Sequence, residues 1–154
     1  GDTGVAGAQH MVDSTAGDPA HGRLLTAEED RRVGSTLRDY RLATGTYNGH
    51  SLPVFDADAE GIALWSCSAE DGYWIAVDQL TPTRFRVFDR ATLAPAGVFS
   101  GKLVSNTDGE TIYAMPTPRF PAGALFALHN DVALAAIDLR DIARALDLQG
   151  GCPR

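Results

Sequence analysis

Residues 56–101 read DADAEGIALWSCSAEDGYWIAVDQLTPTRFRVFDRATLAPAGVFSG, and this stretch decides the fold. It contains four short runs rich in the aromatic and β-branched residues that fit a half-buried strand. These runs are residues 62–67, 73–77, 85–88 and 98–99. Turn-forming residues separate them, since glycine allows positive φ, proline fixes φ and aspartate can bond its own backbone. We therefore predict one four-stranded antiparallel meander.

A single sheet of this kind cannot bury both of its faces. Radial repetition of such sheets solves the problem, as in a β-propeller, where each sheet is a blade. We therefore predict a mostly β chain in which this meander is one blade. With 154 residues in the chain and roughly 40 to 50 residues per blade, there is room for about two to three blades. We expect part of a larger propeller, completed by N-terminal blades or by another chain.

Residues 26–43 carry the clearest helical pattern. Thr26 and Glu29 have the spacing of a capping box, and the acidic cluster at 28–30 favours the positive end of a helix dipole. Three apolar residues share one face of such a helix: Val33, Leu37 and Tyr40. Because Gly34 weakens the helix, two shorter helices are an alternative. We interpret 26–45 as a helical insertion that caps the propeller or docks a partner.

The segments on either side of this insertion are predicted from shorter signals. Residues 1–25 have no apolar periodicity and are interpreted as a loop-rich N-terminal segment. Residues 46–55 contain an Asn48-Gly49 pair, which predicts a hairpin, and they open the propeller blades, assigned to 46–154.

The end of the chain contains three further expected strands and a short helix. The strands are residues 110–115, 124–128 and 132–137, with a hairpin turn at 129–131. The last strand is a continuous apolar run, which is typical of a buried strand. A C-terminal helix is predicted over 138–146, with Asp138 as its N-cap.

Composition excludes two classes of function. The formal net charge of −7 argues against a nucleic-acid surface, which needs a basic footprint. No apolar run approaches the length of about 18 residues that crosses a bilayer, so we expect no membrane span.

The two cysteines, Cys67 and Cys152, are far apart in the sequence. Cys67 ends a predicted strand, and Cys152 lies in a Gly-Gly-Cys-Pro tail without another obvious anchor. We predict a disulfide that fixes the tail, which would imply an oxidising compartment; two unrelated thiols are the alternative. The expected location is therefore secreted or periplasmic.

The order of several motifs resembles the later blades of the β-propeller phytases. The matching segments are DAEGIALW at 58–65, GYWIAVDQ at 72–79, FRVFDR at 85–90, NTDG at 106–109 and FPAGALFA at 120–127. They are similar to that family's D-x-E-G, G-Y-L-I-A-S-S-Q-G, Y-x-V-Y-[DE]-R, T-D-G and Y-P-x-G-x-F-V-A segments, and the resemblance covers roughly residues 50 to 146.

This resemblance implies six blades and calcium-dependent hydrolysis of a phosphomonoester such as phytate. It implies that Glu60 and Asp108 are catalytic calcium ligands. Asp58 is a further candidate ligand, because alternate carboxylates of an extended segment project to the same side. Gln79 and Tyr73 match strands of the family and are the candidate residues of the substrate channel; for Tyr73, packing in the core is the favoured alternative.

Two departures from the family pattern favour a second hypothesis. Residues 128–131 read LHND where the family has A-Q-D-G, and the acidic loop before Asp108 is shortened. Both changes remove negative ligands, on which calcium affinity depends. The alternative function is therefore a non-catalytic propeller scaffold or interaction subunit. A thiol nucleophile at Cys67 has little support, because no histidine spacing demands it.

Overall fold

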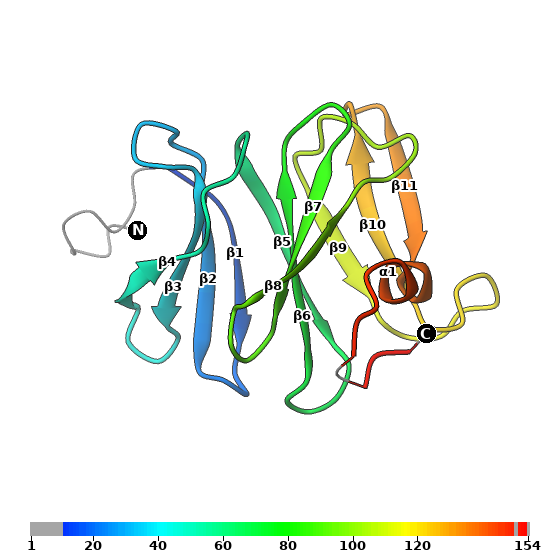
Figure 1. The fold of residues 1–154 in the computed structure, drawn as a ribbon, viewed down its shortest axis with the longest axis horizontal. Helices are drawn as coiled ribbons and strands as arrows, with labels where there is room; N and C mark the ends of the chain where they lie inside the picture. Colours follow the sequence, from blue (N-terminus) through cyan, green and yellow to red (C-terminus); the bar gives the residue numbers. More distant parts are fainter. Residues whose placement is uncertain (1–10, 150, 154) are drawn as a thin grey trace.

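The computed structural model describes residues 11–149 and 151–153. Three antiparallel sheets stand side by side in chain order (Figure 1). The first contains β1 (Val12–Asp18), β2 (Arg23–Glu28), β3 (Thr36–Arg41) and β4 (Thr46–Ser51). The second contains β5 (Ala59–Ser66), β6 (Gly72–Asp78), β7 (Arg84–Asp89) and β8 (Pro95–Phe99). The third contains β9 (Glu110–Tyr113), β10 (Ala124–His129) and β11 (Ala133–Asp138), followed by α1 (Leu139–Ala145).

The helical insertion predicted at 26–43 is wrong, because the end of β2, the turn after it and β3 occupy residues 26–41. Leu25 and Ala27 of β2 and Leu37 of β3 are buried, and their side chains pack between the first two sheets rather than along a helical face. Gly34 has a φ of 89°, which suits the turn between the two strands and is foreign to a helix. Strands that are buried on both faces lack the alternation of polar and apolar residues by which a strand is usually recognised. The acidic cluster at 28–30 has the composition of a helix N-terminus, and the segment was therefore predicted to be helical.

Two neighbouring predictions also need correction. The segment assigned to a loop includes β1, which pairs with β2 from Val12↔Glu28 to Asp18↔Arg23; the first ten residues lie outside the described part. The hairpin predicted at 46–55 is instead the single edge strand β4. Gly49 has a φ of 83°, but it lies within β4, where the register with β3 is irregular.

The central prediction is confirmed. Strands β5 to β8 pair in sequence order as one four-stranded meander. All seven residues of β6 are buried, because the second sheet is covered on both faces. One core joins it to the first sheet and includes Leu25, Trp74 and Phe88. The other joins it to the third sheet and α1, and includes Trp65, Leu125 and Ile142.

The third sheet confirms the expected strands and corrects one burial prediction. The turn after β10 contains Asn130 and Asp131, both with positive φ. The last strand, β11, was expected to be buried, but it is the outer edge of its sheet and is largely exposed. Helix α1 is confirmed, and its N-cap Asp138 accepts a hydrogen bond from the Arg140 backbone N–H at 2.8 Å. No helix in the described part is long and apolar enough to cross a bilayer.

The first strands of the three sheets lie next to one another: β1 contacts β5, and β5 contacts β9. The remaining strands of each sheet extend outward from this row (Figure 1). A row of neighbouring first strands is the inner lining expected where blades surround an axis. β1, β5 and β9 are therefore the strands that would lie nearest the axis of a complete ring.

Candidate functional site

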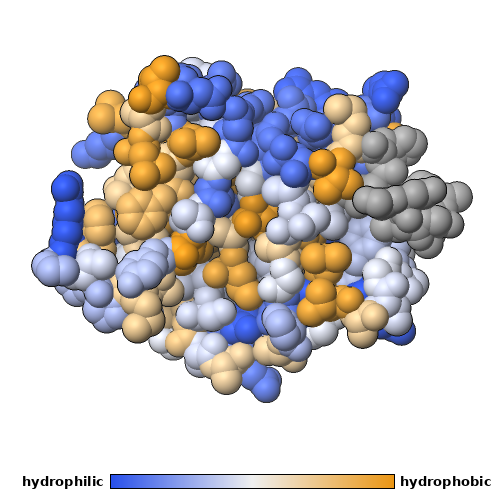
Figure 2. Space-filling view, turned by 180° about the vertical axis from the view of Figure 1, so that it is seen from behind, coloured by the Kyte–Doolittle hydropathy of each residue, from blue (hydrophilic) through white to orange (hydrophobic). Residues whose placement is uncertain are grey.

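Acidic residues gather where these inner strands begin. Glu60 lies on β5 and is 6% exposed. Its carboxyl shares a hydrogen bond with Asp13 of β1, and Glu29 and Asp108 also lie close enough to act on its charge. Burial, followed by the Asp13 carboxylate, raises the pKa of Glu60 to about 8. Glu60 therefore keeps its proton at neutral pH. In Figure 2, hydrophilic residues gather at the top centre and upper right of the molecule, and hydrophobic residues at the upper left.

Asp108 and Gln79 lie together at the same end. Gln79 Nε2 donates a hydrogen bond to Asp108 Oδ1. The Asp108 carboxyl also bonds the side chain of Asp131, which raises the pKa of Asp131. The structure thus brings Glu60, Asp108 and Gln79 into one neighbourhood and adds Asp13 and Asp131, which the sequence analysis did not single out as site residues.

Asp58 and Tyr73 have other neighbours. Both carboxylate oxygens of Asp58 accept hydrogen bonds from the Arg31 guanidinium, with 3.1 Å between Arg31 Nη2 and Asp58 Oδ2. Tyr73 is 6% exposed and packs in the core, with its ring centroid 6.2 Å from that of Trp65. The structure therefore places Asp58 in an ion pair and Tyr73 between two sheets.

The residues at this end of the inner strands suit a metal ion in their atom types but not in their arrangement. Carboxylate and amide oxygens are the ligands that calcium prefers, and this end of the inner strands supplies several. Among residues 11–149 and 151–153, however, no three His, Cys, Asp or Glu side chains converge as a metal-binding group. In this conformation a shared proton, rather than convergent ligands, relieves the repulsion between Asp13 and Glu60.

Glu110 on β9 is a residue that the sequence analysis missed. Both of its carboxyl oxygens are buried and have no hydrogen-bond partner among the described residues. Burial raises the pKa of Glu110 well above its usual value, so the side chain is neutral. The Asp58-x-Glu60 spacing recurs at Asp108-x-Glu110, and this repeat was the available signal. A Cβ on Gly61 would lie 3.0 Å from Glu110 Cγ, so glycine allows β5 and β9 to approach closely here.

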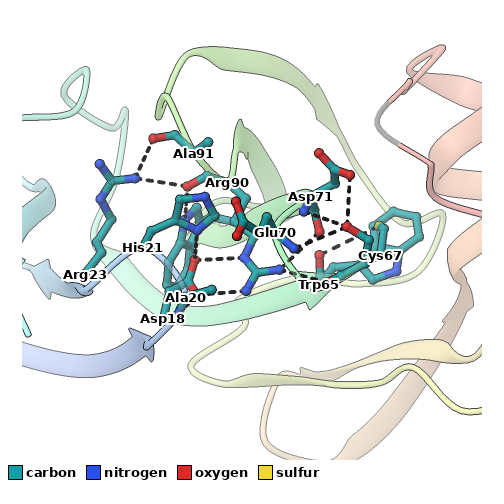
Figure 3. Close-up of polar contacts among 12 residues, drawn as sticks. Asp18, Ala20, His21, Arg23, Trp65, Cys67, Glu70, Asp71, Arg90 and Ala91 are labelled. Atoms are coloured by element: carbon teal, nitrogen blue, oxygen red, sulfur yellow. Dashed lines mark hydrogen bonds and ion pairs between the residues drawn. The ribbon is translucent and has the colours of Figure 1, made fainter.

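The joint between the first two sheets is a buried ion pair (Figure 3). Asp18 ends β1 and Arg90 follows β7, and the side chains are fully buried or nearly so. Arg90 also donates to the backbone carbonyls of Ser68 and Asp71. Its hydrogen bonds lower the pKa of Asp18 to about 2, although burial opposes the shift. His21 Nδ1 lies 2.8 Å from the same aspartate.

The joint between the second and third sheets is covalent. Cys67 follows β5 and forms the predicted disulfide with Cys152, with 4.8 Å between the two Cα atoms. Cys152 is 7% exposed and belongs to the core shared by α1 and the two sheets. The disulfide prediction is confirmed, and the tail is fixed against the second sheet.

Comparisons with known proteins support the architecture. No family model matches the sequence, and the search of curated proteins found no match. Among solved structures, the chain is similar to a structure of U3-55K and to a crystal structure of the RRP9 WD40 repeats. Each has a TM-score of 0.61 and 12% identity, over 84% of this chain and 36% of the other.

The fold is that of a β-propeller. At 12% identity the likeness concerns the fold alone. The chain spans about a third of the length of those structures, so it corresponds to a few blades of such a ring. The comparisons give no support to the phytase-like resemblance.

Proposed function

We propose that this chain is a non-catalytic part of a β-propeller, a scaffold segment completed by further blades of the same or another polypeptide. One observation carries the proposal: the joints between the three sheets contain a buried ion pair, Asp18–Arg90, and a disulfide, Cys67–Cys152. Such joints fix the angle between neighbouring sheets, which an incomplete ring needs if further blades are to fit. The disulfide supports a secreted or periplasmic location.

The second candidate is calcium-dependent hydrolysis of a phosphomonoester of the phytate type by the completed propeller. The carboxyls of Asp13, Glu60 and Asp108 at the inner end of the strands favour it. A bound calcium would neutralise substrate phosphates and acidify a water. Glu60 and Asp108 would be the ligands from this chain, once Glu60 has lost its proton.

A phosphate-release assay separates the two candidates. Phytate is incubated with the protein, alone and joined to its further blades, in millimolar calcium and in chelator. The scaffold proposal predicts no calcium-dependent release in any sample. Release that requires calcium and is abolished by Glu60→Gln would overturn the scaffold proposal and establish the second candidate. Glu70→Gln, in an exposed turn, is the matched control.

A further inference from the structure

A hollow lies between the second and third sheets on their outer side. Its walls are residues 99–102 after β8, residues 136–138 at the end of β11, residues 119–120 of the loop between β9 and β10, and Asp141 of α1. Its volume of about 490 Å³ falls within the roughly 300–1,000 Å³ of small-molecule sites. Since β8 and β11 are the outer strands of their sheets, this hollow is separate from the acidic residues at the inner strands.

The two basic residues of the hollow, Lys102 and Arg119, have no carboxylate partner within the described ranges. The Arg119 guanidinium carbon lies 5.5 Å from the centroid of the Phe120 ring. Every other arginine among residues 11–149, except Arg41, forms an ion pair. In a chain with a net charge of −7, two unpaired cations at one hollow mark a place where an anion can bind.

The acidic residues of the hollow have arginine partners of their own. Asp138 Oδ2 lies 2.8 Å from Arg140 Nη2, and Asp141 Oδ1 lies 3.4 Å from Arg144 Nη1. Both arginines belong to α1, and their charges offset those of the two carboxylates. The charges left without a partner at the hollow are therefore the positive ones.

The aromatic surface of the hollow is held in place by its neighbours. The Phe99 ring stacks on Phe85, with 4.9 Å between the ring centroids. Hydrogen bonds within the loop position Phe120: its N–H donates to Thr117 Oγ1 at 2.9 Å, and its carbonyl accepts from the Gly123 N–H at 2.9 Å. Fixed aromatic side chains lose little freedom when a flat apolar ligand packs on them.

The segment that carries Lys102 is also held in place. The Thr83 N–H donates to the Val104 carbonyl at 3.0 Å, and Val104 is buried. A Cβ on Gly101 would lie 2.8 Å from Val104 Cγ2 and 3.6 Å from Ile137 Cδ1. Glycine therefore allows this segment to lie against β11, and the hollow exists before any ligand binds.

We propose that this hollow binds a small aromatic acid, a flat apolar body that carries a carboxylate or a phosphate. The body packs against Phe99 and Phe120, and the anionic group accepts charge-assisted hydrogen bonds from Lys102 and Arg119. The ligand contacts the second and third sheets together, so its binding stabilises their joint. This inference goes beyond the scaffold function and does not depend on it.

Calorimetric titration with four probes tests the proposal. Naphthoate and naphthyl phosphate combine the body with the charge, naphthalenemethanol has the body alone, and acetate has the charge alone. At least one naphthyl anion should bind saturably, and the alcohol and acetate should bind roughly tenfold more weakly or less, because each lacks one set of contacts. The tighter of the two anions identifies the charged group. All titrations are made in chelator, so that calcium at the inner strands does not contribute.

Lys102→Gln and Arg119→Gln should each weaken binding of that anion by roughly fivefold or more and leave the alcohol unchanged. Both side chains are exposed, so neither variant should disturb the fold. Arg41→Gln is the matched control, since Arg41 is also exposed and unpaired within the described ranges but lies on β3 of the first sheet; it should bind like the wild type.

Amide shifts in NMR spectra locate the ligand, and the perturbed residues should lie at 99–102, 119–120 and 136–141. The proposal is overturned if neither naphthyl anion binds saturably, or if the alcohol binds as tightly as the anions. Equal losses in Arg41→Gln and the two variants of the hollow would also overturn it, because the anion would then be attracted by positive charge in general. Each of these failures leaves the scaffold function intact.

Discussion

Arg90 holds Asp18 in a bidentate ion pair, with 2.8 Å from Nε to Oδ2 and 2.8 Å from Nη2 to Oδ1. The pair joins β1 of the first sheet to the turn after β7 of the second. A second contact from the first sheet holds the backbone of Arg90, because Arg23 Nη1 donates a hydrogen bond to the Arg90 carbonyl at 3.0 Å. A buried charge contact between residues 72 positions apart thus supplements the apolar core that joins the first two sheets.

Arg90→Met should destabilise the protein by about 3–5 kcal/mol, because it leaves the Asp18 carboxylate buried without its main partner. Urea unfolding measures the change. Arg144→Met is the control: Arg144 lies 3.4 Å from Asp141, both side chains are more than half exposed, and such surface pairs contribute about 0–1 kcal/mol. Equal losses for the two variants would contradict the structural role of Arg90.

Glu60→Gln should reduce the loss of stability with rising pH. The pKa of Glu60 is raised from 4.5 to about 8 in the folded protein, so the folded state binds the proton more tightly than the unfolded state. Its stabilising contribution is complete below about pH 4.5 and disappears as the pH rises through 8. We expect the variant to gain about 2 kcal/mol over the wild type at pH 8.5, after allowance for the coupling to Asp13. Thermal melts from pH 5 to 9 measure this, and parallel curves would contradict it.

Removal of the disulfide should destabilise the fold without abolishing it. Cys67 and Cys152 are separated by 85 residues, and closing a loop of that length stabilises by about 3–5 kcal/mol in the chain-entropy treatment. The Cys67→Ala/Cys152→Ala double variant should show this loss in urea unfolding. Reduced wild type should match the double variant. Two alkylatable thiols in the native, unreduced protein would show that the bond is not formed.

Glu110→Met should stabilise the protein by about 1–2 kcal/mol at neutral pH. The glutamate buries two oxygens without a partner among the described residues, and an apolar side chain of similar shape has no desolvation penalty. Glu110→Gln should gain less, since it retains polar atoms. Chemical unfolding of the wild type and both variants measures which is the most stable. A loss of stability in Glu110→Met would mean that the carboxyl is needed by the fold.

The sequence predicted those features whose signals are local. The second sheet follows from strand-length runs between turn residues, and α1 follows from Asp138 as an N-cap, because each signal lies within a few residues of the element it specifies. The first sheet was not predictable in this way, since Thr26 and Glu29 have the spacing of a helix cap but belong to β2 and the turn after it. This segment forms strands because β2 pairs with β1 on one side and with β3 on the other, and because both faces of the pair are buried.

The candidate site was predictable only for residues close together in the sequence. Glu60 and Asp108 were identified from motifs, but the Asp13 carboxyl that shares a proton with Glu60 comes from another strand. The contact arises because β1 and β5 are neighbouring inner strands, with Ser14 Oγ donating to the Glu60 carbonyl at 2.6 Å. The buried state of Glu110 depends in the same way on the approach of β9 to Gly61. Such contacts between blades have no local sequence signal.

Hydrogen exchange of the free protein, resolved by strand, tests the central claim most directly. The claim is a rigid propeller segment whose third sheet lacks its outer strand. Amides of β7, which pairs with strands on both sides, should exchange slowly, whereas the amides of β11 that face away from β10 should exchange close to the rate of an unpaired chain. Equal protection of β7 and β11 in the isolated protein would contradict the account, because the edge of the third sheet would then already be covered.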